Sequence, residues 1–259
     1  MPQDTRRRLA LLGVLVAVFA VLAAVAVLLA PADQFAPPGG EAPAVPGTMP
    51  VWQLALINGA ILFVAYGLLG LAGVWLAGKL QLPVVYRLAA GWRAWLLWPL
   101  LIGLALGLAL IIGDQVFVRL GAGPGFPHPA FPLSLIASAT AGIGEEILFR
   151  GFVMGLWALL FNLLLRRWNG RQAALWIGNA LAALAFSAGH LPSAMILLGA
   201  ATPAQIPPLI LVELFLLNTL AGLVAGERYA RDGLVGAVGV HFWADVVWHV
   251  LWPALSPAV

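Results

Sequence analysis

Long apolar runs alternate with short polar segments along the whole chain. A helix needs about 20 mainly apolar residues to cross a bilayer. Seven runs approach or exceed that length: 9–29, 52–76, 95–118, 133–165, 173–190, 209–225 and 234–255. We expect Pro192, just after the fifth run, to stop or kink that helix. The pattern predicts an all-α polytopic membrane protein, a bundle of about seven transmembrane helices without a soluble domain or internal repeat.

The first apolar run follows three arginines and precedes a Pro/Gly-rich stretch, which is typical of an N-terminal membrane anchor. A cleavable signal peptide is the rival interpretation, because Ala30-Pro31-Ala32 offers small residues for cleavage. The run is longer than the usual apolar core of such a signal, about 7 to 15 residues. We divide the chain into an anchor and linker (1–50), two further transmembrane helices (51–130) and a C-terminal membrane domain (131–259).

Composition supports the membrane assignment and excludes other classes of protein. Hydrophobic residues make up 63% of the chain and charged residues 9%, far from the composition of a soluble domain. The absence of cysteine excludes disulfides and thiolate sites. A net charge of +3 could indicate a nucleic-acid partner, but the basic residues are scattered among loops, so we expect none.

The basic residues predict the orientation in the membrane instead. With seven crossings, eleven of the thirteen Lys and Arg residues fall on one side: positions 6–8, 79, 87, 93, 166, 167, 171, 228 and 231. Short loops rich in Lys and Arg stay in the cytoplasm. The sequence therefore predicts a multi-pass protein of a prokaryotic plasma membrane, with a cytoplasmic N-terminus.

The fourth run carries three charged residues, Glu145, Glu146 and Arg150. Each ionised side chain near the bilayer centre costs about 2.5 to 3.5 kcal/mol, so such residues usually have a function. Glu146 and Arg150 are four residues apart, with the acid first, which favours an ion pair. Glu145 points about 100° away and is left as a candidate general base. The structural alternative is a buried ion-pair network that fixes helix register.

The later runs add His190, and His241 four residues before Asp245. The spacing places His241 and Asp245 on one helical face, where they could converge on one point. The alternatives are a histidine at the membrane interface and a local hydrogen-bonded pair. We expect Asp114 and Glu213, near the ends of their runs, to snorkel to the interface. His249 is expected to pack or to line the mouth of a cavity.

Three motifs occur on successive late helices: Glu145-Glu146-x-x-x-Arg150, Phe186-x-x-x-His190 and His241-x-x-x-Asp245. In this order they resemble the motifs of the CPBP intramembrane proteases, a family that includes CAAX prenyl endopeptidases and bacteriocin-processing or self-immunity proteins. The resemblance covers about residues 133–248. It implies a site among the fourth, fifth and seventh helices and a membrane-associated protein or peptide as substrate.

The resemblance also implies a role for each motif residue. Glu145 would activate water, aided by His190, while His241 and Asp245 would position or polarise the scissile carbonyl. Glu146 and Arg150 would brace the site. The family commonly has Asn at the position of Asp245, which cannot donate a hydrogen bond unless protonated. Asp245 would instead orient His241, or ligate a metal. We expect no cofactor; the alternative is zinc bound by Glu145, His190, His241 and Asp245.

Other membrane chemistries lack their motifs. The sequence contains no His-Glu-x-x-His, no Gly-x-Ser-x-Gly, and no Gly-x-Gly-Asp of the presenilin kind. A proton-coupled carrier remains an alternative, although the polar residues cluster in the C-terminal half without repeat symmetry. A catalytically silent immunity or scaffold protein on the same fold is a further alternative.

Overall fold

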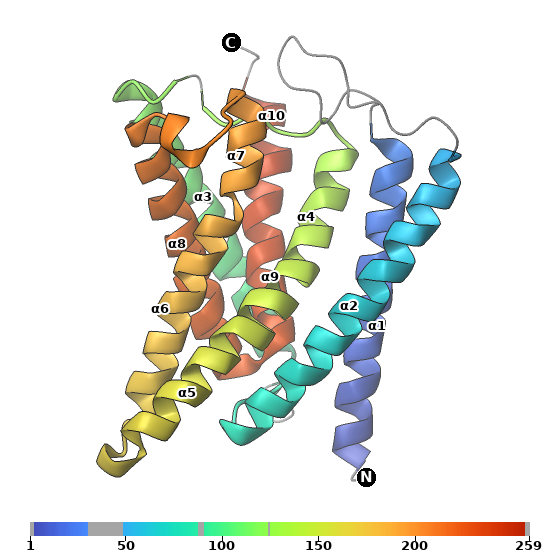
Figure 1. The fold of residues 1–259 in the computed structure, drawn as a ribbon, viewed down its shortest axis with the longest axis vertical. Coiled ribbons are helices and arrows are strands. Elements are labelled where there is room, and N and C mark those ends of the chain that lie inside the picture. The colour runs from blue at the N-terminus through green and yellow to red at the C-terminus, as the bar shows by residue number, and fades with distance from the viewer. Residues whose placement is uncertain (1–2, 31–48, 88–90, 124, 257–259) are drawn as a thin grey trace.

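The computed structural model describes residues 3–30, 49–87, 91–123 and 125–256, and within these ranges it contains helices and no strand. Figure 1 shows a bundle of long helices. Seven helical stretches are long and apolar enough to cross a membrane, which confirms the predicted count. They are 5–29, 51–79, 93–119, 133–168, 171–198, 208–232 and 234–255.

Several spans are built from more than one helical segment. The first two are α1 (Gln3–Leu29) and α2 (Val51–Lys79), and the sixth is α8 (Pro208–Asp232). The third joins η2 (Arg93–Leu97) to α3 (Trp98–Arg119). The fourth joins α4 (Leu133–Glu145), η3 (Glu146–Met154), α5 (Gly155–Leu165) and η4 (Arg166–Trp168). The fifth joins α6 (Arg171–Gly189) to α7 (Leu191–Leu198), and η5 (Pro203–Gln205) follows it. The seventh joins α9 (Leu234–Asp245), η6 (Val246–Leu251) and α10 (Trp252–Leu255).

Three of these segments, η2, η3 and η6, are π-helical. The apolar runs predicted continuous helices there, because hydrophobic spacing does not report a local change of helical pitch. η3 begins directly after Glu145, and η6 directly after Asp245. π-helical segments occur often at functional sites. Here they flank two of the residues that the motifs single out.

Small residues let the helices approach closely. α3 packs along α9, where a Cβ on Gly103 would lie 2.6 Å from the Cβ of Trp243. One turn on, a Cβ on Gly107 would lie 2.6 Å from the Cβ of Val247. The third span is therefore fitted against the seventh, which carries His241.

A tight junction fixes the start of α9. Gly233 has a positive φ of 91°, and a Cβ there would lie 2.8 Å from the carbonyl of Val85. The backbone N–H groups of Leu234 and Val235 donate to the carbonyls of Val84 and Val85, at 3.2 and 2.9 Å. These bonds satisfy donors that a helix start leaves without partners. The loop after α2 therefore anchors the seventh span.

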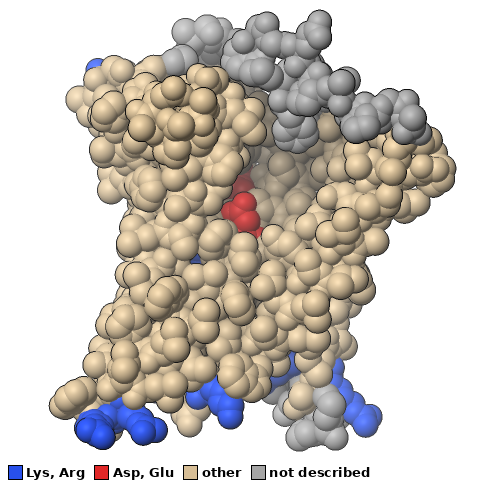
Figure 2. Space-filling model, in the orientation of Figure 1, with Lys and Arg blue, Asp and Glu red and all other residues tan. Residues whose placement is uncertain are grey.

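Lys and Arg side chains gather at the end of the bundle where the N-terminus lies (Figure 2). By the positive-inside rule this end faces the cytoplasm, which remains a prediction. Figure 2 also shows a hollow in the other half of the bundle, with acidic side chains visible inside it. The basic end and the acidic hollow are thus separated along the membrane normal.

The structure leaves part of the predicted organisation untested. The linker and most of the candidate cleavage site, residues 31–48, lie outside the described residues. α1 packs against α2 and α4, and the Phe19 ring lies 4.4 Å from that of Tyr66. The first helix is therefore part of the bundle. The division at residues 50 and 130 stays a prediction.

The close approach of α3 and α9 generates a stability prediction. Gly107→Ala should lower the free energy of unfolding by about 1 to 3 kcal/mol, because the added methyl group overpacks the contact with Val247. Gly67→Ala is the matched control: its Cβ would meet nothing within 4 Å. Thermal unfolding in detergent measures both. Equal midpoints for the two variants would contradict the packing.

Candidate active site

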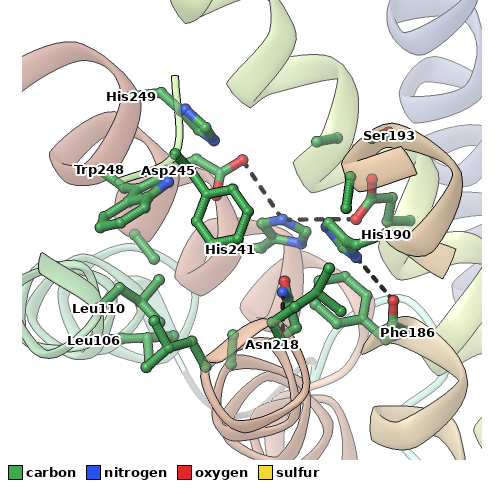
Figure 3. A pocket seen from close by; sticks show the side chains of 18 of the residues that line it. Leu106, Leu110, Phe186, His190, Ser193, Asn218, His241, Asp245, Trp248 and His249 are labelled. Carbon is green, nitrogen blue, oxygen red and sulfur yellow. Dashed lines mark hydrogen bonds and ion pairs between the residues drawn. The ribbon is translucent and has the colours of Figure 1, made fainter. Parts of the chain in front are cut away.

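A cavity of about 290 Å³ opens among α3, α4, α6, α8 and α9. Five of the six predicted site residues line it: Glu145, Arg150, His190, His241 and Asp245. The sixth, Glu146, lies behind His241 and bonds to it. Figure 3 shows His190, His241 and Asp245 around one space. The structure thus brings together residues that are up to a hundred positions apart in the sequence.

Glu146 is the most deeply buried member of the site. Its side chain has no exposed surface, and its Oε2 lies 3.2 Å from the Arg150 Nε. Its Oε1 lies 2.8 Å from His241 Nδ1. The Arg150 guanidinium also stacks 4.6 Å from the ring centroid of Phe186. The predicted ion pair between Glu146 and Arg150 is confirmed, and it is joined to the seventh span.

The bond to Glu146 orients the His241 ring. Because a carboxylate oxygen accepts, His241 Nδ1 carries the proton in this bond. The Nε2 then faces the cavity, 3.5 Å from Asp245 Oδ2 and 3.9 Å from Glu145 Oε2 (Figure 3). The predicted convergence of His241 and Asp245 is confirmed. The Asp245 carboxyl lies where it can interact with the Nε2 of the His241 ring.

Glu145 differs from its neighbour in its surroundings. A third of its side chain, 33%, is exposed to the cavity, whereas Glu146 has none. Its only ionic neighbour within 4 Å, among the described residues, is the His241 Nε2. The sequence expectation that Arg150 pairs with Glu146 rather than Glu145 is confirmed. Glu145 is the acid with room for a water molecule or substrate.

His190 caps α6 at the rim of the cavity. Its Nδ1 donates to the Phe186 carbonyl at 2.8 Å, so the Nε2 is left to act as an acceptor. The Phe186 ring lies edge-on to both imidazoles, with centroids 4.8 Å from His190 and 5.6 Å from His241. The aromatic residue of the second motif thus positions both histidines.

The side chains considered as zinc ligands do not form a metal site in this arrangement. No three His, Asp or Glu side chains within the described ranges are placed to hold a metal ion together. The His241 Nδ1 is engaged with Glu146, and its Nε2 lies 3.5 and 3.9 Å from the carboxylates that would share the ion. The alternative zinc set of Glu145, His190, His241 and Asp245 stays a prediction.

Two acids contradict their predicted location. Asp114 and Glu213 were expected to snorkel to the membrane interface, but they are 3% and 2% exposed, and Glu213 lines the cavity. Distance from a helix end does not reveal which side of the helix faces the bundle. His249, as expected, lines the cavity, and its Nδ1 lies 3.1 Å from that of His128.

Three residues beside the motifs were not predicted from the sequence. Asn218 and Ser193 line the cavity, and the Asn218 amide donates to the Leu214 carbonyl at 2.8 Å. His128, in the loop before α4, contacts His249. Burial lowers the pKa of His128, although the charge of Asp114 opposes this shift. Single polar residues of these types carry no spacing signal that would have found them.

A lipid-embedded cavity with a free carboxylate, two oriented imidazoles and a buried counter-ion has the parts of an intramembrane hydrolase. The model of the family "Type II CAAX prenyl endopeptidase Rce1-like" matches residues 127–247, which include all three motifs. Residues 127–247 therefore match the CPBP/CAAX intramembrane protease family that the motifs indicated. No match was found among curated proteins or among solved structures.

The buried pair generates a second prediction. Arg150→Ala should destabilise the protein by about 3 to 5 kcal/mol, because it leaves the Glu146 carboxylate buried without its cation. Arg231→Ala is the matched control, since Arg231 pairs with Glu227 over the same spacing but has 69% of its side chain exposed. That change should cost about 1 kcal/mol or less. Chemical unfolding in detergent would refute the burial argument if both variants unfolded alike.

Proposed function

We propose that this protein is an intramembrane endopeptidase in which Glu145 activates a water molecule to hydrolyse a peptide bond. The observation that carries the proposal is the contrast between the adjacent acids. Glu146 is fully buried and held by Arg150, while Glu145 is open to the cavity beside the His241 Nε2. An acid without a fixed cation can accept a proton, which a general base must do.

The proposed reaction uses each residue at a stated atom. Glu145 takes a proton from water as the oxygen attacks the carbonyl carbon, and the Nε2 of His190 orients that water. His241, protonated on both nitrogens, donates to Glu146 from Nδ1 and to the developing oxyanion from Nε2. When the C–N bond breaks, Glu145 returns its proton to the leaving amine. Asp245 keeps the His241 ring in place beside the oxyanion.

The surroundings of the cavity support a membrane-associated substrate. A second hollow of about 670 Å³ shares Pro127, Ser193, Leu197 and His249 with the cavity and continues outward from it. Its further lining, from the loop before α4 and from α7, is mainly apolar. The matched family is named for prenylated CAAX substrates. This apolar hollow would accommodate an apolar or lipid-bearing segment of a protein or peptide on its way to the cavity.

The carrier alternative fits the packing less well. Glu146, Ile147 and Arg150 are at most 1% exposed, and they lie beneath the cavity toward the basic end. A carrier needs a path that opens alternately to both sides, and this layer blocks such a path in the arrangement observed. A silent scaffold or immunity protein is separated from an enzyme by the following experiment.

Glu145→Gln should reduce peptide cleavage by about 10²-fold to 10⁴-fold, because the amide keeps the shape of the side chain and loses the base. Glu227→Gln makes the same chemical change at the basic end of α8 and is the control. Proteomic comparison of membranes that contain the native protein or each variant would reveal lost fragments. Undiminished cleavage by the Glu145 variant would exclude the assignment, whereas immunity by binding alone would survive the change.

We further propose that water activation proceeds without a metal ion, because the candidate ligands do not form a set. Cleavage should persist after treatment with 1,10-phenanthroline or EDTA, since no step passes through zinc. Rates before and after chelation measure this. Loss of cleavage that returns on adding zinc would show that the side chains rearrange around a metal.

A further inference from the structure

The cavity holds an acidic group that the proposed reaction does not use. Glu213 on α8 is 2% exposed, lines the cavity, and has no hydrogen-bond partner for its Oε1. Asp114 on α3 is 3% exposed, and its Oδ1 also lacks a partner. The Asp114 carboxyl lies close enough to that of Glu213 for the two groups to interact electrostatically. Glu213 on α8 therefore contributes an acid to the cavity wall, and Asp114 on α3 contributes a second acid near it.

No cation of the described residues pairs with this acidic group. No Lys, Arg or His nitrogen among them forms an ion pair with Glu213 or Asp114 within 4.0 Å. Asp114 Oδ2 accepts only from the amide of Gln115, at 3.0 Å. Burial lowers the pKa of His128, and the charge of Asp114 opposes this shift. The His128 ring contacts His249 instead of pairing with Asp114. The acids lack the partner that buried charges normally have.

A buried carboxylate without a counter-ion is unfavourable, and such groups gather at binding sites. Here Glu213 belongs to the wall of the same cavity that contains Glu145. Apolar side chains of α3 and α8 line the wall beside it: Leu106, Leu110, Leu214 and Leu217. A long aliphatic stem that ends in a cation matches this combination, because the stem packs on the leucines while the charge meets the acid.

We propose that Glu213, backed by Asp114, binds an ammonium or guanidinium group of the substrate while the scissile bond lies at Glu145. This inference rests on the proposed peptidase function and adds a substrate class: membrane-associated peptides with a basic group near the cleaved bond. A free carboxylate at this position would meet Glu213, Glu145 and Asp245. The site therefore selects against an acidic group there.

Binding of the benzamidinium ion, with benzyl alcohol as the neutral comparison, tests the acidic site without any cleavage. Binding to the full-length protein in detergent is measured by isothermal titration calorimetry. We expect Glu213→Gln to weaken benzamidinium binding about tenfold or more, because the charged acceptor is lost. Glu213→Asp should retain part of the affinity. The control Glu227→Gln should bind like the native protein.

Glu145→Gln separates this inference from the peptidase proposal. It should retain benzamidinium binding even where cleavage is abolished, because the cation lies at Glu213. Equal affinity in the native protein and Glu213→Gln would overturn the inference, as would a loss caused by Glu145→Gln instead. Should Glu213→Gln unfold, Asp114→Asn provides the second variant and should also weaken binding.

Competition with peptides distinguishes the two sources of the cation. An N-acetylated peptide with an internal lysine presents a side chain, and a lysine-free peptide with a free N-terminus presents a terminal amine. The N-acetylated norleucine analogue presents neither and should not displace benzamidinium. Displacement by the first peptide alone assigns the site to a side chain, and by the second alone to an N-terminus. Displacement by neither would overturn the inference.

Discussion

The structure of the site depends on one buried carboxylate, that of Glu146. Its two oxygens meet Arg150 on the same helix and His241 on the seventh span, so a single group connects two distant parts of the chain. The connection decides which nitrogen of His241 faces the cavity. It also takes up the guanidinium, which leaves Glu145 without a permanent counter-charge. The chemistry proposed for Glu145 thus follows from the bonds made by its neighbour.

The remaining packing keeps this connection in register. α3 lies against α9 through Gly103 and Gly107, and the loop at Val84–Val85 holds the beginning of α9. Each contact limits how far the seventh span can slide relative to the third span or to the loop after α2. Since a carboxylate–imidazole bond weakens steeply with distance and angle, the small residues of the bundle support the geometry of the site. The positions of the helices thus determine whether Glu146 can bond to His241.

Sequence alone predicted the spans, the Glu146–Arg150 pair and the convergence of His241 with Asp245. Each depends on a local regularity: the length of an apolar run, or a four-residue spacing on one helical face. Glu213 and Asp114 were misplaced because which side of a transmembrane helix faces its neighbours is set by tertiary packing. The π-helical pitch of η3 and η6 was missed because apolar residues on every face leave no periodicity to read. The part of the site that depends on helix rotation therefore required coordinates.

The position of the Phe186 ring links three polar groups of the site. It contacts the guanidinium of Arg150 through its face and both imidazoles through edge-on packing. A rigid plane shared by three polar groups cannot tilt for one of them alone. A displacement of the ring would therefore change the surroundings of His190, Arg150 and His241 together.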